Sequence, residues 1–424
     1  MSKCEVLIIG AGPSGASAAY WLAKAGIDVT VIEKKTFPRE KTCGDGLTPR
    51  SVYQLEAMGL GNFLATQHRY DGLRAVAFGK EMELNWPYHE ELPSYGYIVT
   101  RYDLDQAVSQ HAAKAGAKII EGAEATGTTT DSSGKITGIT IQMKSSGEKL
   151  TMEPTYVIIA DGSNSRIGRS LGVTRDRNFP MGLAIRGYFS SPGTFDPYIE
   201  SHLDIRTKQG EVLPGYGWIF PLGDGRVNVG IGLLSTAGRW KEVNTTKMME
   251  AFVESAPKRW ELSLDDPIYK PTGGKLPMGF SLGPRRGPNY LIVGDASGAI
   301  NPFNGEGIAY GYETGRIAAD VVGDAIRFKD PTVLARYERS IDDKYGDYYR
   351  VARVFVALIG KPIIMRTAVS VGMRSRTIMT PLVRIMANLM RDNENGVPEL
   401  AYKAGLTIVK SLEWWHRRKK TSAG

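Results

Sequence analysis

The amino-terminal segment constrains the fold of this 424-residue chain more than any other part of it. The stretch CEVLIIGAGPSGASAAYWLAKAGIDVTVIEK contains an apolar run, a glycine-rich turn, a helix-forming segment that ends near Gly26, and a second apolar run. Continuous apolar runs are typical of strands buried in a parallel sheet. The segment therefore predicts a βαβ unit in which Gly10, Gly12 and Gly15 stand where such units bind a dinucleotide.

Each part of this unit has a physical role in binding a dinucleotide. Glycines permit a tight turn and a close approach of the backbone to a pyrophosphate, and the free N–H groups at the start of a helix attract phosphate. Glu33 ends the second strand, 18 residues after Gly15, where a carboxylate accepts hydrogen bonds from ribose hydroxyls. The residues predicted to contact the dinucleotide here are Gly10, Gly12, Pro13, Ser14, Gly15, Glu33 and Lys34.

Two later segments favour FAD over NAD as the dinucleotide. In LIVGDASGAINPFNGEGI an apolar run leads to Asp295, and a helix is expected from about Gly305 to Arg327. Its first N–H groups would face an electron-rich ring edge. In IIADGSNSRIGRSLG another apolar run leads to Asp161. The residues predicted to contact the cofactor in these segments are Asp161, Asp295, Gly305, Gly307 and Ile308.

The stretch YGWIFPLGDGRVNVGIG carries an aromatic residue at every second position, and this spacing places Tyr216, Trp218 and Phe220 on one face of a strand. The next strand ends in Gly230 and Gly232, where a missing side chain lets a bulky ring approach the backbone. Two interpretations remain open for these residues. They form either a packed hairpin face or a wall beside a flat cofactor and an apolar substrate.

This combination of segments resembles the flavoprotein hydroxylase superfamily. Within it, PREKTCGDGLTPR (38–50) is similar to the flavin loop of geranylgeranyl reductases. The Tyr-x-Trp-x-Phe-Pro pattern, followed after eight residues by Gly-x-Gly, is also similar to that family. CGDGLTPR and LPGYGWIFPLG most resemble the menaquinone reductases of actinobacteria within it. The likeness runs from the amino terminus to about residue 330.

The resemblance implies an FAD-dependent oxidoreductase that saturates a carbon–carbon double bond in the isoprenoid tail of a lipid, with one isoprene unit of menaquinone as the leading substrate. It implies further flavin contacts by Cys43, Gly44, Asp45, Gly46 and Arg101. Asp45 departs from the family, whose loop often continues in glycines, so it would tune the flavin or touch the substrate. The implied catalytic residues are Cys43, Tyr216 and Trp218, and the implied substrate contacts are Tyr216, Trp218 and Phe220. We find no convincing general acid.

Other functions stay open at this point. Another prenyl lipid would suit the same site as menaquinone. A flavin-dependent monooxygenase or halogenase is a rival, although Tyr216 and Phe220 differ from the Trp-x-Trp-x-Ile-Pro motif of halogenases. A lipid carrier without flavin chemistry is a weaker rival. The chain has no second Gly-x-Gly-x-x-Gly, so NAD(P)H, ferredoxin and a separate reductase all remain candidate electron donors.

We therefore predict an α/β protein with a Rossmann-like FAD-binding domain of the flavoprotein hydroxylase type, an antiparallel β-sheet substrate domain and a helical tail. The FAD-binding domain would be discontinuous. It would comprise residues 1–75, 97–178 and 275–330, with 76–96 and 179–274 as the substrate domain and 331–424 as the tail.

The positive charge is concentrated in the tail. Residues 331–424 hold 17 Lys and Arg against 8 Asp and Glu, a net of +9, whereas the first 330 residues hold 36 and 37, a net of −1. Bases mixed with apolar residues at helical spacing, followed by two adjacent tryptophans in EWWHRRKK, favour a helix on an anionic membrane surface. A solvated helical cap is the alternative. We expect a peripheral protein on the cytoplasmic face of the membrane, with no nucleic-acid partner, no bound metal and, given two cysteines, no disulfide framework.

Overall fold

The computed structural model describes residues 2–206, 209–210, 212, 215–236, 243–265, 267–391 and 396–421. Leu213 and Pro214, the first two residues of the motif LPGYGWIFPLG, lie outside the described residues. The side chains of the basic cluster at 417–420 also lie outside them, so this part of the charge-based prediction has no structural outcome.

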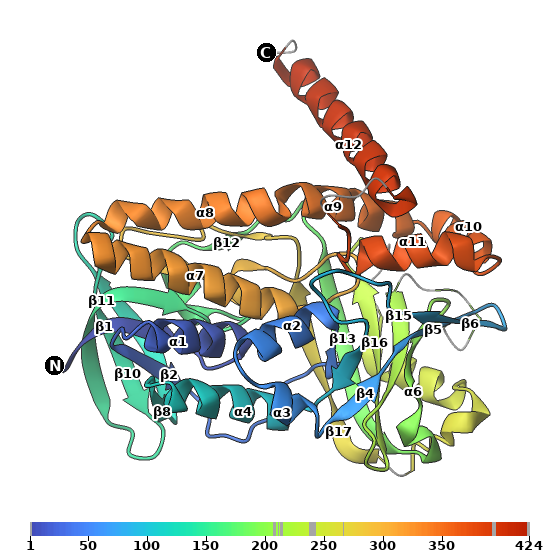
Figure 1. The fold of residues 1–424 in the computed structure, drawn as a ribbon, viewed down its shortest axis with the longest axis horizontal. Coiled ribbons are helices and arrows are strands. Elements are labelled where there is room, and N and C mark those ends of the chain that lie inside the picture. The colour runs from blue at the N-terminus through green and yellow to red at the C-terminus, as the bar shows by residue number, and fades with distance from the viewer. Residues whose placement is uncertain are drawn as a thin grey trace.

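A seven-stranded sheet is built around the predicted βαβ unit (Figure 1). Its strands follow the order β8-β2-β1-β11-β10-β9, and β19 lies beside β11. The strands β8, β2, β1, β11 and β19 are parallel, and β9, β10 and β11 form an antiparallel meander. The bounds are β1 (Ser2–Ile9), β2 (Val29–Glu33), β8 (Lys118–Glu121), β9 (Ala123–Thr130), β10 (Ile136–Met143), β11 (Lys149–Ile159) and β19 (Tyr290–Ile292).

Alternate side chains of the central strands are buried on opposite faces of this sheet. Val6 and Ile8 of β1 pack with the helices, whereas Leu7 and Ile9 pack with the meander. Both faces are therefore covered, as a parallel sheet requires, which explains why the run VLII is apolar throughout. The helices around this sheet are α1 (Pro13–Lys24), α2 (Pro49–Ala57), α3 (Gly61–Leu64), α4 (Arg101–Lys114), α5 (Arg166–Ser170) and α7 (Ile308–Phe328).

A second seven-stranded sheet, here named the cap sheet, has the order β17-β13-β16-β15-β14-β5-β6. It is antiparallel except where β14 runs parallel to β5. One face packs against α6 (Thr245–Glu254), and the other faces the loops of the first sheet (Figure 1). Its strands are β5 (Gly72–Ala77), β6 (Lys80–Asn85), β13 (Met181–Ser190), β14 (Tyr198–His202), β15 (Gly215–Pro221), β16 (Arg226–Leu234) and β17 (Pro267–Pro277).

Short strands connect the two large sheets. The strands β3 (Gly46–Leu47), β7 (Gly96–Ile98) and β4 (His68–Tyr70) form one small sheet, and β12 (Thr174–Arg175) pairs with β18 (Leu282–Gly283). The predicted domain boundaries need correction at the cap sheet. Its strands cover 72–85 and 181–277, because backbone pairing places all of β5 and all of β17 in it.

The carboxyl-terminal helices are of two kinds. Tyr337, Tyr345 and Tyr349 are fully buried in the same core as α1 and α7, so residues 334–352 belong to the body of the protein and the prediction of a membrane-associating tail is wrong for them. The helix α12 extends away from the body beyond its first turns (Figure 1). The helices are α8 (Ala335–Ile341), α9 (Asp347–Ile359), α10 (Pro362–Gly372), α11 (Arg376–Met386) and α12 (Val397–Thr421), with a π turn at Asp342–Gly346 between α8 and α9.

No single helix among the described residues is long and apolar enough to cross a membrane. One bent pair, 331–359 with 363–372, meets the length and composition criteria together, with a bend of 108° between its halves.

Candidate active site

The predicted dinucleotide segments meet at one edge of the first sheet. The parallel strands β1, β2, β11 and β19 end side by side, so Glu33 at the end of β2 lies near Gly10, Asp161 and Asp295, which come shortly after the ends of the other three strands. Ligands of open α/β sheets bind outside this carboxyl edge. Ser14 lies directly against Gly294, since a Cβ on that glycine would be 2.4 Å from the Ser14 hydroxyl oxygen.

The glycine turn has the geometry that a pyrophosphate site needs. Gly10 has a φ of +100°, and a Cβ on Gly15 would lie 1.9 Å from the Gly10 carbonyl oxygen, so both positions require glycine. Gly12 differs, because its Cβ would contact only the Arg39 guanidinium at 3.7 Å. Gly12 therefore leaves an open place in front of the start of α1, where Pro13 occupies the first helical position and backbone N–H groups can face phosphate.

Glu33 is held beside this turn. Its carboxylate accepts hydrogen bonds from the backbone N–H groups of Ala11 at 2.9 Å and Lys35 at 3.1 Å. The predicted contact residue Lys34 is exposed at the end of β2.

A buried group of charges stands behind the turn. The Arg101 guanidinium donates to both carboxylate oxygens of Asp105, at 2.8 and 2.6 Å, and Arg39 contacts the same carboxylate at 3.0 Å. Arg39 also lies 3.5 Å from Glu33. Two guanidinium groups here pair with two carboxylates and balance their charge, and Arg39 is a member that the sequence analysis did not single out.

Asp161 and Asp295 have different surroundings. Asp161 caps α5, because one carboxylate oxygen accepts from the backbone N–H groups of Arg166 and Ile167, while its other oxygen is buried without a partner among the described residues. Asp295 is half-buried and pairs with Lys41 at 3.0 Å. A buried carboxylate oxygen without a donor is the kind of group that a ligand hydroxyl satisfies.

The helix predicted from Gly305 begins at Ile308 instead. Gly305 has a φ of +77°, and its N–H donates to the Asn301 carbonyl, so residues 301–307 form a turn that ends with Gly307 as the helix cap.

The flavin loop, residues 38–50, is fastened to the cap sheet through two side chains of that sheet. Arg186 donates to the Cys43 carbonyl oxygen at 3.2 Å and to Glu40 at 2.6 Å. The Asn228 amide group donates to the Cys43 carbonyl at 2.9 Å and to Asp45 at 2.7 Å. Arg186 and Asn228 together therefore position the flavin loop against the cap sheet. Neither residue was predicted from sequence.

Asp45 is an anchor of this loop. It is fully buried, adopts a φ of +65°, and its carboxylate accepts hydrogen bonds from Asn228, from the Tyr188 hydroxyl at 2.5 Å and from the Arg101 backbone N–H at 3.2 Å. Burial raises its pKa to about 6, although Arg186 and these hydrogen bonds act in the opposite direction. The expectation that Asp45 touches the substrate is not supported, because protein groups occupy its carboxylate oxygens.

The aromatic residues of β15 form a continuous row. The ring centroids of Tyr216 and Trp218 are 5.7 Å apart, and those of Trp218 and Phe220 are 6.3 Å apart. Phe220 lies against the flavin loop, because a Cβ on Gly44 or Gly46 would be 3.0 or 3.1 Å from its ring. At the other end, the Tyr216 hydroxyl donates to the Asn304 carbonyl at 2.9 Å. This row, the aromatic wall, spans the distance between the flavin loop and the turn before α7.

The two glycines of β16 serve the aromatic wall itself. Gly230 lies opposite Trp218, and a Cβ there would be 2.3 Å from the indole ring, whereas a Cβ on Gly232 would lie 3.6 Å from Tyr216. The expected close approach of a ring to the backbone is thus made by the chain's own tryptophan. The ring of a ligand is not needed to explain Gly230.

Two predicted catalytic residues are poor proton donors at neutral pH. Burial raises the pKa of the Cys43 thiol, and burial raises the pKa of the Tyr216 hydroxyl to about 12. Cys43 is half-buried, and its sulfur accepts from the Asp45 N–H at 3.4 Å, so it holds the loop in shape. Cys4 is buried in β1.

One acidic residue of the site escaped the sequence analysis. Glu306 stands between two of the predicted flavin glycines, and one of its carboxyl oxygens accepts from the Thr48 and Ser51 hydroxyls at the start of α2. Its other oxygen is buried without a partner among the described residues. Burial raises its pKa to about 7. The only sequence signal was a single acid inside NGEG, which looks like an ordinary turn.

Comparisons with known proteins agree with this geometry. A family model described as FAD binding domain matches residues 3–185, and one described as geranylgeranyl reductase catalytic domain matches residues 190–264. The chain is 40% identical over 412 residues to a protein named menaquinone reductase from Mycobacterium tuberculosis, which covers 97% of each chain. A protein of the same name from Mycolicibacterium smegmatis is 39% identical over 400 residues, 93% of each chain.

The chain belongs to the geranylgeranyl reductase family of FAD-dependent oxidoreductases. The fold agrees with a solved structure described as geranylgeranyl bacteriochlorophyll reductase-like, from Thermoplasma acidophilum. It has a TM-score of 0.77 at 24% identity and covers 94% of this chain and 98% of that one. Because the alignment to the mycobacterial relative spans 412 residues, the likeness also extends past residue 330, further than the sequence motifs indicated.

FAD is the cofactor of this reductase, and the residues at the sheet edge fit it. The open place at Gly12 before α1 suits the pyrophosphate, Glu33 stands where ribose binds, and the aromatic wall and flavin loop suit the ring. When bound and reduced, FAD supplies a hydride for reduction of a carbon–carbon double bond. Among the described residues, no group of three or more His, Cys, Asp or Glu side chains could hold a metal ion.

Proposed function

We propose that this reductase saturates one carbon–carbon double bond in the isoprenoid tail of menaquinone. The aromatic wall carries the proposal. Its two polar atoms are already used within the protein, since the Trp218 indole N–H donates to Asn228 at 2.9 Å and the Tyr216 hydroxyl donates to the Asn304 carbonyl. Only apolar ring surface is left for a ligand. Such a surface suits a polyprenyl chain, which has no hydrogen-bonding groups.

The name of the mycobacterial relatives, menaquinone reductase, supports this choice of substrate. In the proposed reaction the protein's own residues align the double bond and exclude water. Trp218 is almost fully buried and fixed by Asn228, which also fixes Cys43 and Asp45 through its amide group. The wall and the flavin loop are thereby held in one arrangement.

Single-turnover reduction under anaerobic conditions tests the proposal. The protein, reduced with dithionite in place of its natural electron donor, is mixed with menaquinone in detergent, and the products are analysed by mass spectrometry. We expect a gain of two hydrogens that persists after air reoxidises the quinone ring. An unchanged tail in protein that contains flavin would reject menaquinone, and geranylgeranyl diphosphate would be tried next.

We further propose that the protein binds the cytoplasmic face of the membrane through a surface centred on α10. Five apolar side chains are exposed there, namely Leu358, Ile363, Ile364, Val371 and Ile378, with Ile363 at 82% exposure. Four exposed bases accompany them: Lys361, Arg366, Arg374 and Arg376. We name these nine residues the α10 surface. The chain has no Asp or Glu between 347 and 392, so this surface carries no opposing charge of its own.

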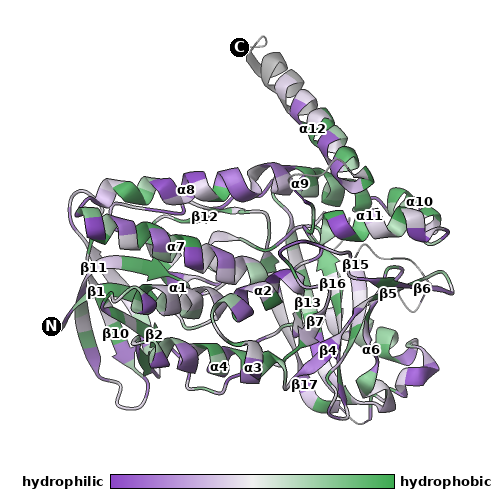
Figure 2. Cartoon of the chain, viewed as in Figure 1, coloured by the Kyte–Doolittle hydropathy of each residue, from purple (hydrophilic) through white to green (hydrophobic). Residues whose placement is uncertain are grey.

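Apolar side chains beside bases are the composition of interfacial membrane-binding helices. Much of α10 and of the adjoining part of α11 is coloured as hydrophobic in Figure 2, although α10 lies at the edge of the molecule. Other bases of the segment serve the protein body, since Arg384 bonds the Tyr88 carbonyl and Arg353 stacks on Phe179 at 4.4 Å. The proposal therefore concerns the α10 surface and not the whole segment 331–424. Vesicle binding, described below, tests it.

A further inference from the structure

Saturation of an alkene needs two different hydrogens. Bound, reduced FAD would supply a hydride to one alkene carbon and would be left oxidised. A proton must reach the other carbon, and its donor has to be protonated at working pH and able to release the proton. The residues that the family resemblance offered do not suit this role, because the pKa of the Cys43 thiol is raised by burial and that of Tyr216 reaches about 12.

We propose that the carboxyl group of Glu306 supplies this proton. The inference rests on the proposed function, since it concerns the same double bond. Glu306 lies in the turn that also contacts the aromatic wall. The Tyr216 hydroxyl donates a hydrogen bond to the backbone carbonyl of Asn304, two residues before Glu306, and a Cβ on Gly305 would lie 3.7 Å from the same hydroxyl. The flavin loop contacts the same carboxyl group through Thr48. Glu306 therefore stands where the loop, the wall and the start of α7 converge.

The two carboxyl oxygens of Glu306 differ in their hydrogen bonds. One oxygen accepts from the Thr48 hydroxyl and, at 3.4 Å, from the Ser51 hydroxyl. The other is buried and has no partner among the described residues. Ionisation would leave a buried, charged oxygen without a donor, which favours the neutral acid, and this oxygen can then carry the proton toward a ligand. The backbone is fixed as well, because the Glu306 N–H donates to the Asn304 side chain at 3.0 Å.

The surroundings set the acidity of this group near neutrality. Burial raises the pKa of Glu306 to about 7, the nearby Glu313 carboxylate adds to the rise, and the Thr48 and Ser51 hydroxyls and the Arg50 guanidinium oppose it. The other titratable groups that act on it or respond to it are Tyr70, Tyr216, Tyr310 and Tyr348. A donor with a pKa close to the working pH is the most effective kind.

In the proposed step the O–H bond of Glu306 breaks and a C–H bond forms at the second alkene carbon, using the electrons of the double bond. The hydride forms the C–H bond at the first carbon. The product is the saturated unit, and the carboxylate that remains regains its proton from water after the lipid leaves.

The test compares wild type, Glu306→Gln and Thr48→Val in the single-turnover assay across pH 5–9. We expect the wild-type rate to fall as the pH rises through about 7, because Glu306 loses its proton there. Glu306→Gln should slow the step by about 10²- to 10⁴-fold, as loss of a general acid does, and should abolish this pH limb. Thr48→Val keeps the carboxyl group but removes a hydrogen bond that lowers its pKa, so the limb should move to higher pH.

Infrared spectroscopy provides a readout that does not depend on turnover. The difference between the spectra of wild type and Glu306→Gln should contain the C=O band of a protonated carboxyl group that titrates near pH 7, and this band should shift in Thr48→Val. The buried Asp45 carboxyl group, whose pKa is about 6, is present in all three proteins and is removed by the subtraction. A Glu306→Gln protein with the wild-type rate, or with an unchanged pH limb, overturns the proposal, since the limb would then belong to another group such as the reduced flavin. A limb that stays in place in Thr48→Val while the infrared titration moves also overturns it.

Failure of the proposed function would look different. If wild type leaves the menaquinone tail unchanged, the substrate assignment is wrong, and the same three proteins are assayed with geranylgeranyl diphosphate to test Glu306.

Discussion

At the scale of single residues, the two glycines that flank the start of α1 have separate tasks. Gly15 is needed for folding, since its Cβ would lie 1.9 Å from the Gly10 carbonyl oxygen, whereas Gly12 only leaves space for the cofactor. Gly12→Ala should therefore keep the unfolding free energy of the FAD-free protein within about 1 kcal/mol of wild type but weaken FAD binding at least tenfold.

Gly15→Ala is the matched variant and should lower the stability of the FAD-free protein by more than about 2 kcal/mol. Denaturant unfolding and FAD titration by fluorescence measure both effects. Equal FAD binding by Gly12→Ala and wild type would show that the pyrophosphate does not lie at this turn.

The glycines of β16 offer a second matched pair. A Cβ at Gly230 would lie 2.3 Å from the Trp218 indole and 2.5 Å from the Ile185 carbonyl oxygen, whereas a Cβ at Gly232 has room at 3.6 Å. We expect Gly230→Ala to destabilise the protein by about 1–3 kcal/mol and to slow tail reduction by displacing Trp218, with Gly232→Ala within about 1 kcal/mol of wild type. Denaturant unfolding and the single-turnover assay give the comparison. Similar behaviour of the two variants would contradict this account of the aromatic wall.

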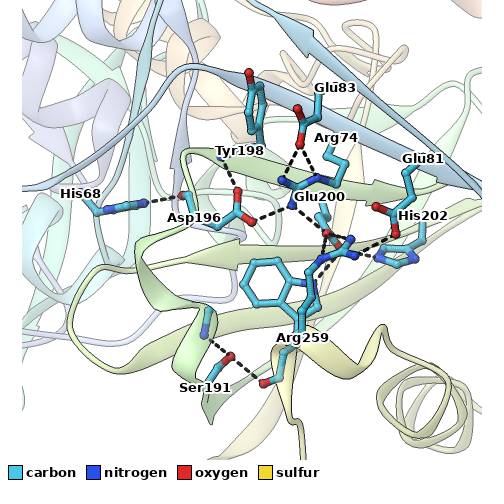
Figure 3. A network of polar contacts seen from close by, with 12 residues as sticks. His68, Arg74, Glu81, Glu83, Ser191, Asp196, Tyr198, Glu200, His202 and Arg259 are labelled. Atoms are coloured by element: carbon cyan, nitrogen blue, oxygen red, sulfur yellow. Dashed lines mark hydrogen bonds and ion pairs between the residues drawn. The ribbon is translucent and has the colours of Figure 1, made fainter.

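At the scale of secondary-structure elements, the outer face of the cap sheet is joined by a buried ionic network (Figure 3). Glu200 of β14 is fully buried and accepts from Arg74 on β5, from Arg259 and from the Trp260 indole N–H. His202 completes its surroundings at 3.0 Å. The network thus connects β5, β14 and the 3-10 turn Lys258–Trp260, on the opposite face of the sheet from the aromatic wall.

Loss of the Glu200 charge should weaken this part of the fold. Glu200→Gln leaves Arg74 and Arg259 without a full counter-charge, and breaking a buried ion pair costs about 3–5 kcal/mol, less here because Arg259 is partly exposed. Glu83, which pairs with Arg74 but is 44% exposed, is the control, and Glu83→Gln should cost under about 1 kcal/mol.

The effect of Glu200 should also depend on pH. Burial alone would raise its pKa, but hydrogen bonds from His202, Arg259 and Trp260 lower it from 4.5 to about 2. A depressed pKa means that the stabilisation is complete above pH 4.5 and is lost as the pH falls toward 2. The stability difference between wild type and Glu200→Gln, measured by urea unfolding, should shrink over this range. A constant difference would show that the charge of Glu200 is not what stabilises the network.

At the scale of the whole molecule, the α10 surface lies at the opposite end from the β9–β11 meander (Figure 1). If it binds anionic lipid, replacing Arg366 and Arg374 by Gln should weaken binding to vesicles of phosphatidylglycerol by roughly 30-fold, since each base near such a surface contributes about 1 kcal/mol. The binding of wild type should weaken as salt is added, because exposed charges are screened.

Two controls accompany this measurement. Lys135→Gln with Lys149→Gln removes the same charge from the exposed meander and should leave vesicle binding unchanged. Vesicles of neutral lipid should bind wild type and the arginine variant alike. If the meander variant loses as much binding as the arginine variant, net charge and not the α10 surface is responsible.

Local sequence determined much of this protein. The order of strand, glycine turn and helix, the alternation of Tyr216, Trp218 and Phe220, and the cofactor follow from spacing, because a βαβ unit and a strand are set by periodicities of the chain itself. The burial of residues 334–352 did not follow, since a helix with both apolar and basic residues can face either a core or a membrane.

Only the tertiary structure brought Asn228, Arg186 and Glu306 into the site. Their contacts join the flavin loop to strands or turns more than 140 residues away in sequence, and no local pattern encodes such a pairing. The same holds for the acidity of Glu306, which depends on burial and on the charges that folding places around it. Sequence by itself thus specified the elements and the cofactor, whereas the fold decided which side chains hold the loop and which of them can carry a proton.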